Sequence, residues 1–328
     1  MSEPASPRVS VVVRSMNRLE ALVELLERLL AQRHDGFEIV VVEQTRARPP
    51  AQQARLDALA ADPRLRVLDR PPLGGPGARN EAVRAARGDI VILVDDDDLP
   101  LSSDWIAAHE AAFADPMLVG ITGRHVRSEG EQGHPFRPLP RWFLRRRCMS
   151  YSLLRTPYTF ARYDQDVDGV GWLHGTNASF RREAALRAGL WDTAVRSQDE
   201  HSFAFKLQRV LRPGEYLAFR AHPPLLRRLD IAGGMDKRRA SLRNQVDINL
   251  QFVHRVIGRY FPARMRLFYP LYLAWSLYRT IQWIWSASRD GGSQSRRMRD
   301  LASLPVVFAA AWWSEIRRAR APSAPVAG

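Results

Sequence analysis

The chain has 328 residues, of which 45% are hydrophobic and 26% charged, as in an ordinary globular protein with one large domain or a domain plus an appendage. Lys and Arg (49) outnumber Asp and Glu (35), and the net charge of +14 favours anionic ligands or surfaces. The single cysteine, Cys148, excludes an intrachain disulfide and a cysteine-based zinc cluster, and the start MSEPASPRVSVVV lacks a signal-peptide core, so we expect a cytoplasmic location.

The first hundred residues alternate short apolar runs with helical patterns. After a disordered tail at 1–8, the pattern predicts strands at 9–13, 37–42, 65–68 and 90–94, and helices at 19–32, 51–61 and 78–86. Further on, it predicts a helix at 102–114 and a strand at 118–122. This alternation predicts an α/β fold with a doubly wound sheet flanked by helices.

Four carboxylates, Asp95 to Asp98, directly follow the apolar strand 90–94. In open α/β sheets, ligands bind at the carboxyl ends of the strands. Adjacent carboxylates repel one another unless a positive charge compensates them, and a divalent cation that also binds phosphates would do so. The stretch therefore predicts a site for Mg²⁺ or Mn²⁺; the alternative is a solvated acidic turn.

Two other segments carry groups suited to ligand binding. Glu43 ends the strand at 37–42, and neighbouring parallel strands end at the same edge, so Glu43 is predicted to meet a ligand held by the acidic stretch. The glycines of 74–77 let backbone approach a ligand, and Arg79 can pair with a phosphate. The alternatives are a surface acid and a loop that merely starts a helix; the spacing does not fit a dinucleotide fingerprint.

In this order, these segments resemble family 2 of the GT-A glycosyltransferases. The resemblance rests on Val9-Ser-Val-Val-Val with Asn17-Arg18, on Phe37-Glu-Ile-Val-Val-Val-Glu43, on Gly77-Ala-Arg-Asn80 and on Val94-Asp-Asp-Asp-Asp98. It implies a GT-A mixed sheet over residues 9–255 and an inverting transfer from a UDP-, GDP- or dTDP-linked sugar. Gln44 replaces a second acid and Arg14 replaces a common proline, so the identity of the nucleotide stays open.

The resemblance also implies roles for individual residues. It implies that Asp97 is the main metal ligand, with Asp98 beside it and His222 as a third. It places the nucleotide-sugar at Arg14, Asn17, Glu43, Gly77, Arg79, Asn80, Asp95, Asp96, Lys237 and Arg238.

A second block, Gly169 to Glu183, resembles the family's acceptor-side element. The residues predicted to contact the acceptor are Trp172, His174, Gly175, Thr176 and Asn177. Asp199-Glu200 then begins a helix, where a carboxylate can take the proton of an attacking sugar hydroxyl. The register leaves both residues open as the base, with Asp199 preferred because Asp is the family's residue type. The alternative is that the two acids only favour the helix start.

The remaining chain is basic. Residues 9–123 are predicted to form the donor half, and 124–255 the acceptor half, whose Arg145–Arg147 run lacks interleaved aromatics, so we expect no nucleic-acid partner. In 256–328, the aromatic-rich stretch 267–285 is interrupted by polar residues, 304–313 is too short to span a bilayer, and arginines flank both. We predict amphipathic helices on the inner face of the membrane. The alternative is packing on the catalytic domain or on a second subunit of a homo-oligomer.

Together these features predict a metal-dependent, inverting glycosyltransferase that acts on a glycan or lipid-linked acceptor in cell-surface polysaccharide synthesis. Two alternatives stay open. A sugar-phosphate nucleotidyltransferase should carry a glycine-rich loop with a basic residue right after the first strand, from which Arg14-Ser15-Met16-Asn17 departs. A non-catalytic, basic membrane-binding scaffold would explain the charge but not the order of the motifs.

Overall fold

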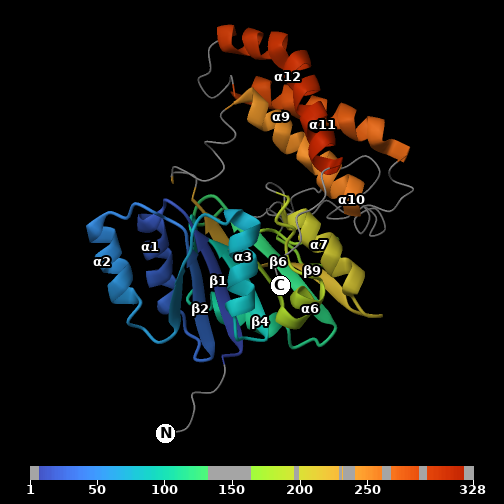
Figure 1. Cartoon of the computed structure of the whole chain (residues 1–328). Helices are drawn as coiled ribbons and strands as arrows, with labels where there is room; N and C mark the ends of the chain where they lie inside the picture. Colours follow the sequence, from blue (N-terminus) through green and yellow to red (C-terminus); the bar gives the residue numbers. More distant parts are fainter. Residues whose placement is uncertain are drawn as a thin grey trace. The chain divides into compact units, whose positions relative to one another are not determined.

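The computed structural model describes residues 7–131, 164–195, 199–228, 231, 241–260, 267–287 and 294–320. The chain divides into two compact units, which we describe separately (Figure 1). The first comprises Met1–Thr193 and Asp199–Gly233, and the second comprises Ala194–Gln198 and Gly234–Gly328.

Nine strands of the described residues form one mixed sheet in the first unit. Its order is β3-β2-β1-β4-β8-β6-β9-β5, and β7 pairs with β9. The strands β1 to β4 are parallel, whereas β8 runs antiparallel to both β4 and β6. The strands are β1 (Val9–Ser15), β2 (Phe37–Glu43), β3 (Leu65–Asp69), β4 (Ile90–Asp95), β5 (Asp98–Pro100), β6 (Leu118–Val126), β7 (Val167–Asp168), β8 (Ala178–Arg181) and β9 (Tyr216–Arg227).

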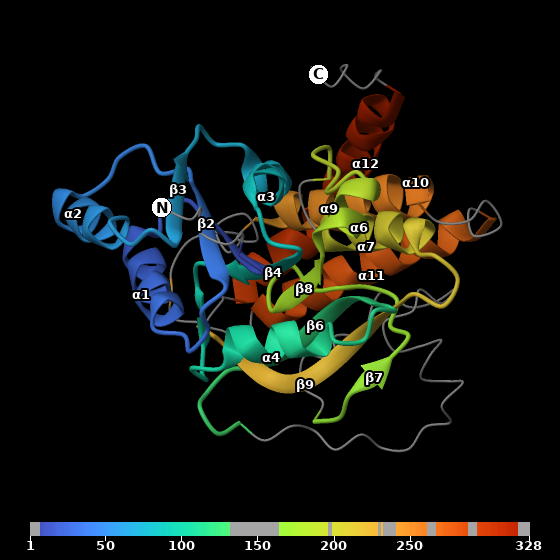
Figure 2. The same cartoon turned by 90° about the horizontal axis from the view of Figure 1, so that it is seen from below.

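Helices cover both faces of this sheet (Figure 2). Successive strand side chains point to opposite faces. Accordingly, Val11 and Val13 of β1 pack with α1 and α4, whereas Val12 packs with α3, α6 and α7. The helices are α1 (Leu19–Leu30), α2 (Pro50–Leu59), α3 (Gly74–Ala85), α4 (Trp105–Ala112), α6 (Arg182–Arg187) and α7 (Asp199–Val210).

The predicted strands and helices of the first hundred residues are present, with one displaced boundary that affects the site. The structure starts α3 at Gly74 rather than at residue 78, so the predicted glycine loop is the first turn of a helix. Pro76 is compatible with this turn because the first amides of a helix have no partner within the helix. Gly74, with φ +74°, supplies the left-handed backbone that leads into the helix.

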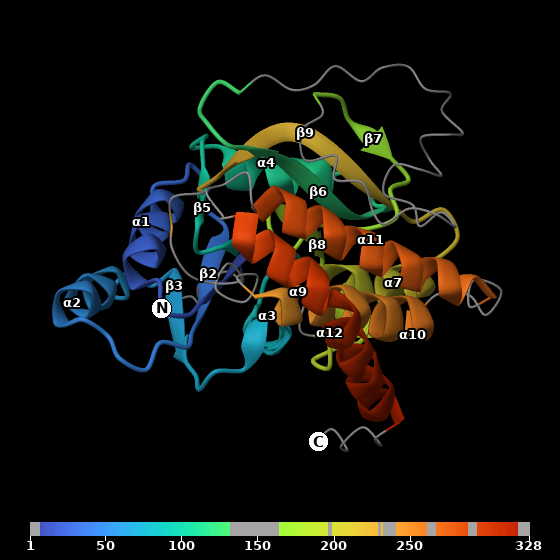
Figure 3. The same ribbon diagram turned by 90° about the horizontal axis from the view of Figure 1, so that it is seen from above.

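The second unit is helical (Figure 3). Helix α9 packs against both α11 and α12 around Val246, Leu250 and Ile284. The fully buried Glu315 is paired with Arg255 at 3.0 Å. The elements of the second unit are α9 (Leu242–Gln251), a π-helical turn (Phe252–Ile257), α10 (Gly258–Tyr260), α11 (Tyr269–Ala287) and α12 (Gln294–Arg320).

Within the described residues, no helix combines the length and the hydrophobicity that crossing a membrane requires. The predicted domain boundary at residue 255 stays a prediction; α9, on the amino-terminal side of that boundary, belongs to the helical unit. Arg145–Arg147 lie outside the described residues.

Candidate active site

The carboxyl ends of β1, β2 and β4 bring the predicted donor residues together. These strands are parallel and in register, with Arg14 beside Asp95 and Ser15 beside Glu43. The backbone amide of Asn17, whose φ is +60°, donates to the hydroxyl of Thr45 at 2.7 Å and ties the loops after β1 and β2 together. One edge of the sheet therefore collects charged side chains from three strands.

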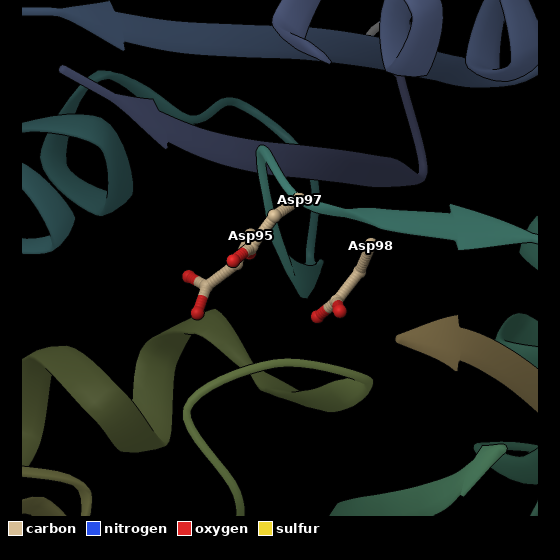
Figure 4. A group of neighbouring side chains, drawn as sticks. All are labelled: Asp95, Asp97 and Asp98. Carbon is tan, nitrogen blue, oxygen red and sulfur yellow. The ribbon is translucent and has the colours of Figure 1, made fainter. Parts of the chain in front are cut away.

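Three carboxylates at this edge form a group that can hold a metal ion. Asp95, Asp97 and Asp98 each offer an oxygen within 4.8 Å of the others, around the turn between β4 and β5 (Figure 4). Asp98 is fully buried and accepts a hydrogen bond from the Thr176 hydroxyl at 2.8 Å. Its other oxygen has no hydrogen-bond partner among the described residues. Burial, followed by the negative charge of Asp95, raises the pKa of Asp98 well above its usual range.

This donor set fits Mg²⁺ or Mn²⁺, because hard cations take carboxylate oxygens and Asp98 has an unpaired oxygen beside the other two acids. The predicted third ligand, His222, is exposed on β9 and is not a member of this group. Asp95, which the sequence assigns to the nucleoside, is a member. The individual ligand roles stay predictions.

Arginines compensate the acidic stretch. Arg14 donates from Nε and Nη2 to the two oxygens of Asp95 at 3.1 and 3.2 Å. Arg18 pairs with Asp96 at 3.0 Å and with Asp97 at 2.7 Å. Burial opposes ionisation of Asp95, but the nearby Arg14 and Arg79 outweigh it and lower its pKa. Burial raises the pKa of Asp96 to about 6, although Arg18 opposes the shift.

Glu43 and Gln44 end β2 in different ways. Glu43 is fully buried; one oxygen accepts from the Thr45 amide at 2.6 Å, and the other has no partner among the described residues. Gln44 accepts from the Leu73 amide at 2.8 Å, just before α3. Glu43 therefore keeps a hydrogen-bonding oxygen, whereas Gln44 links β2 to the start of α3.

Arg79 joins three segments that are far apart in the sequence. From α3, it donates to Asp199 of α7 at 2.5 Å and to the carbonyl of Gly175 at 2.9 Å. A Cβ on Gly175 would lie 2.6 Å from Nη2 of Arg79, so a larger residue here would have to displace the guanidinium. Arg79 also lies 3.5 Å from Asp95. The predicted donor and acceptor residues thus meet through one buried guanidinium.

Asn80 and Gly77, which lie close to Arg79 in the sequence, contact other parts of the fold. Asn80 exchanges two hydrogen bonds with the backbone of Trp191, at 3.0 and 2.9 Å. Gly77 lies in the first turn of α3, where a Cβ would be 3.0 Å from that of Leu73. Nucleotide-sugar contacts by Asn80 and Gly77 stay predictions.

The two candidate bases have different surroundings. Asp199 is buried and its carboxylate is paired with Arg79. For Glu200, burial first and the charge of Asp199 second raise the pKa to about 7, although Arg79 and Arg14 oppose the shift. The pair therefore combines one arginine-bound carboxylate with one that titrates near neutrality.

Aromatic rings and histidines surround the acceptor-side residues. Trp172 lies 4.5 Å from His174 and 4.6 Å from His201 between ring centroids, and His174 lies 4.9 Å from His125. Burial lowers the pKa of His125 to about 4 and that of His201 to about 3, so both are neutral at pH 7. The sequence analysis did not single out His125 and His201, because both lie beside other polar residues in their elements and nothing in the sequence sets them apart.

Thr176 and Asn177 hold the acceptor-side segment in place. Thr176 accepts from the Asp95 amide at 3.0 Å while donating to Asp98. The Asn177 oxygen, fully buried, accepts from Trp105 and His109, each at 3.0 Å, and its amide donates to the Arg124 carbonyl at 2.7 Å. The side chain of Asn177 is thus used within the fold. Lys237 and Arg238 lie outside the described residues.

Residues 10–187, more than half of the chain, match the family model described as glycosyl transferase family 2. The chain belongs to glycosyl transferase family 2. It is 38% identical over 195 residues to succinoglycan biosynthesis protein ExoO of Rhizobium meliloti (strain 1021), covering 56% of this chain and 53% of ExoO. The chain thus spans about half the length of this relative.

Solved structures of glycosyltransferases share the fold. Mannosyltransferase PcManGT from Pyrobaculum calidifontis, in complex with GDP-Man and Mn²⁺, aligns over 96% of this chain and 88% of its own, with 20% identity and a TM-score of 0.54. TarS 1-349 from S. aureus, in complex with UDP, aligns over 98% and 94%, with 14% identity and a TM-score of 0.52. The predicted GT-A fold is confirmed, as is the predicted family.

The surroundings of Asn177 predict a structural role for its side chain. Asn177→Ala removes the partners of Trp105 and His109 and should lower the free energy of unfolding by about 3 kcal/mol, because buried donors lose their acceptor. Urea denaturation measures the change. Asn244→Ala, at an exposed position of α9, is the matched control and should be neutral. Wild-type stability in Asn177→Ala would contradict the structural role.

Proposed function

We propose that this chain transfers a sugar from a nucleotide-diphospho-sugar to a hydroxyl group of a glycan or lipid-linked acceptor. The observation that carries the proposal is the meeting of the acidic group at β4 with the carboxylate pair at the start of α7 through Arg79. The neighbours' complexes with GDP-Man and Mn²⁺ and with UDP support such a donor. The name of the ExoO relative supports a role in polysaccharide synthesis.

On the donor side, Asp95, Asp97 and Asp98 would hold Mg²⁺ or Mn²⁺, and Glu43 would bind the nucleoside through its unpaired oxygen. A bound divalent cation would neutralise charge that develops on the leaving nucleoside diphosphate. The fixed positive charges of Arg18 and Arg79 lie at the same edge and add to this stabilisation without moving.

For the general base we propose Glu200, with Asp199 as the residue that positions Arg79. A base is most effective when its pKa lies near the working pH, and Glu200 meets this condition. The carboxylate of Asp199 is already engaged by a guanidinium at 2.5 Å. This proposal departs from the preference for Asp199 that the sequence alone suggests. A single displacement, with Glu200 taking the acceptor proton, would invert the anomeric carbon.

The donor can be identified by thermal denaturation with UDP, GDP, dTDP and CDP sugars, each with and without Mn²⁺. We expect one nucleotide to stabilise the protein in the presence of Mn²⁺ by about 2.7 kcal/mol at a hundredfold excess over Kd. Asp97→Asn should abolish the shift, whereas the exposed Asp57→Asn should keep it. Absence of a shift with every nucleotide would contradict the transferase and favour a non-catalytic scaffold.

The base assignment can be tested by pH profiles. With Glu200 as the base, kcat/KM should rise with pH through about 7 and then level off, because only the ionised carboxylate accepts a proton. Glu200→Gln should lower kcat by about 10²-fold or more. Asp199→Asn, which loses the ionic partner of Arg79, should lower kcat less than Glu200→Gln does and shift the rise to lower pH, since it removes a charge that raises the Glu200 pKa. The reverse pattern in the two variants would identify Asp199 as the base.

The acceptor proposal includes a location at the inner face of the membrane. On α11, Leu271, Tyr278 and Trp285 recur every seven residues and are 47%, 56% and 49% exposed. On α12, Val306 and Trp313 form a similar exposed row. Seven-residue spacing places side chains on one face of a helix. Each of these two helices therefore carries an exposed apolar face.

Arginines accompany these apolar faces. The Arg297 guanidinium lies 4.5 Å from the centroid of the Trp285 ring, and that of Arg317 lies 5.1 Å from Trp313. Tryptophan next to arginine suits the interface of an anionic bilayer, where the ring enters the head-group region and the cation meets phosphate. This pairing favours a lipid surface over a second copy of the chain, whose surface is also basic.

Flotation with vesicles tests the membrane location. The full chain should float with vesicles of phosphatidylglycerol and phosphatidylcholine, and less with phosphatidylcholine alone. The pair Trp285→Glu and Trp313→Glu should weaken flotation about tenfold or more, whereas Leu186→Glu, an exposed leucine in the first unit, should not. If the tryptophan variants instead convert a dimer to a monomer without affecting flotation, the faces are a subunit interface.

A further inference from the structure

We propose that Arg14 is an internal cation that competes with the divalent metal for Asp95 and binds the nucleoside diphosphate when the metal displaces it. Binding of metal and of nucleotide would then be coupled through one side chain. This inference rests on the proposed function in one respect, namely that the acidic group at β4 holds the cation.

The first argument is geometric. Arg14 and Asp95 are register partners on the adjacent parallel strands β1 and β4, so their side chains emerge side by side. Nε and Nη2 of Arg14 donate to the two separate oxygens of Asp95, which is the bidentate pairing that a guanidinium forms best. Both oxygens that Asp95 could offer to a metal are therefore engaged by one residue.

The second argument is that α3 leaves space for this arginine. A Cβ on Gly75 would lie 2.9 Å from Nη1 of Arg14 and 3.6 Å from its Cζ. Any larger residue at position 75 would contact the guanidinium. The first turn of α3 thus leaves space for the Arg14 guanidinium by carrying a glycine at this position.

The third argument concerns the other arginines at this edge. Arg18 pairs with Asp96 and Asp97, and Arg79 pairs with Asp199 and the Gly175 carbonyl. Loss of one contact would leave each of these with another partner. The two side-chain hydrogen bonds that Arg14 makes within the described residues both go to Asp95. Arg14 is therefore the cation whose pairing conflicts most directly with a metal at Asp95.

A metal at the acidic group would lie a few ångströms from the guanidinium, and like charges at such a distance repel strongly. The metal alone would have to displace Arg14 into solvent, which weakens its binding. Metal that arrives with a nucleoside diphosphate supplies a new partner, because a guanidinium binds phosphate oxygens as readily as carboxylate. Arg14 would thus disfavour the metal alone and favour the metal with its nucleotide.

The test measures two binding constants and no turnover. Mn²⁺ alone is titrated by electron paramagnetic resonance, and UDP and GDP are titrated by calorimetry at saturating Mn²⁺. The proteins compared are wild type, Arg14→Gln, Arg14→Lys and Asp97→Asn. The matched control is Arg66→Gln, since Arg66 on β3 is similarly exposed (29% against 32%) and pairs with the buried Glu38 at 3.0 Å, in a pair distinct from the acidic stretch.

We expect Arg14→Gln to bind Mn²⁺ alone about tenfold more tightly and the nucleoside diphosphate about tenfold more weakly, within the usual range of coupling between two ligands. Arg14→Lys keeps the charge but not the bidentate geometry of the guanidinium. Its affinities for both ligands should therefore fall between those of Arg14→Gln and wild type. Arg66→Gln should match wild type in both titrations.

Other outcomes separate the inference from the proposed function. If Arg14→Gln binds Mn²⁺ as wild type does or more weakly, while Asp97→Asn loses Mn²⁺, the acidic group holds the metal and only the competition is wrong. If Asp97→Asn retains wild-type Mn²⁺ binding, the metal site of the proposed function is itself wrong. If Arg14→Gln gains Mn²⁺ affinity without losing nucleotide affinity, Arg14 competes with the metal but does not bind the diphosphate, and the coupling is overturned.

Discussion

Four consecutive carboxylates at the end of a buried strand repel one another unless positive charge compensates them or some of them take up a proton. In this chain the sheet itself brings part of that charge, because β1 is the neighbour of β4 and carries Arg14 at the matching register. The loop after β1 brings Arg18 to Asp96 and Asp97. Asp98, buried and without an arginine hydrogen bond among the described residues, stays the least compensated of the four acids and is the observation that best supports the proposed cation.

Arg79 extends the same constraint from the donor side to the acceptor side. A buried guanidinium needs several acceptors, and Arg79 finds them in α7 and in the backbone at Gly175, with Asp95 close by. Asp199, which pairs with this arginine, adds to the effect of burial in raising the pKa of Glu200, while Arg79 opposes it. The ion pair thus positions the Asp199 carboxylate and contributes to the proton affinity of its neighbour.

Much of the fold and part of the candidate site could be predicted from the sequence, because both follow from local residue patterns. The alternation of apolar runs and helical patterns locates β1 to β4, and parallel strands that end at one edge bring Glu43 towards Asp95. Other features depend on side-chain orientation, which periodicity does not report. The side-chain amides of Asn177 and Asn80 hydrogen-bond within the fold, to Trp105, His109 and Trp191, which the sequence does not indicate; their predicted ligand contacts stay predictions. The start of α3 was misplaced because glycines normally indicate a loop, whereas here they let a helix pass close to Arg14.

The departures from the family pattern, at Arg14 and Gln44, can be explained together. Arg14, at a position where a proline is common, adds a positive charge that pairs with Asp95, while Arg18 pairs with Asp96 in the same acidic stretch. Gln44, in place of a second acid, gives up a charge and links β2 to the residue before α3. Both replacements make the charge at these strand ends more positive, since Arg14 adds a cation and Gln44 removes an acid. Under the proposed coupling, Arg14 would meet the diphosphate that all candidate donors share, so discrimination between their bases would fall to groups such as Glu43 at the end of β2.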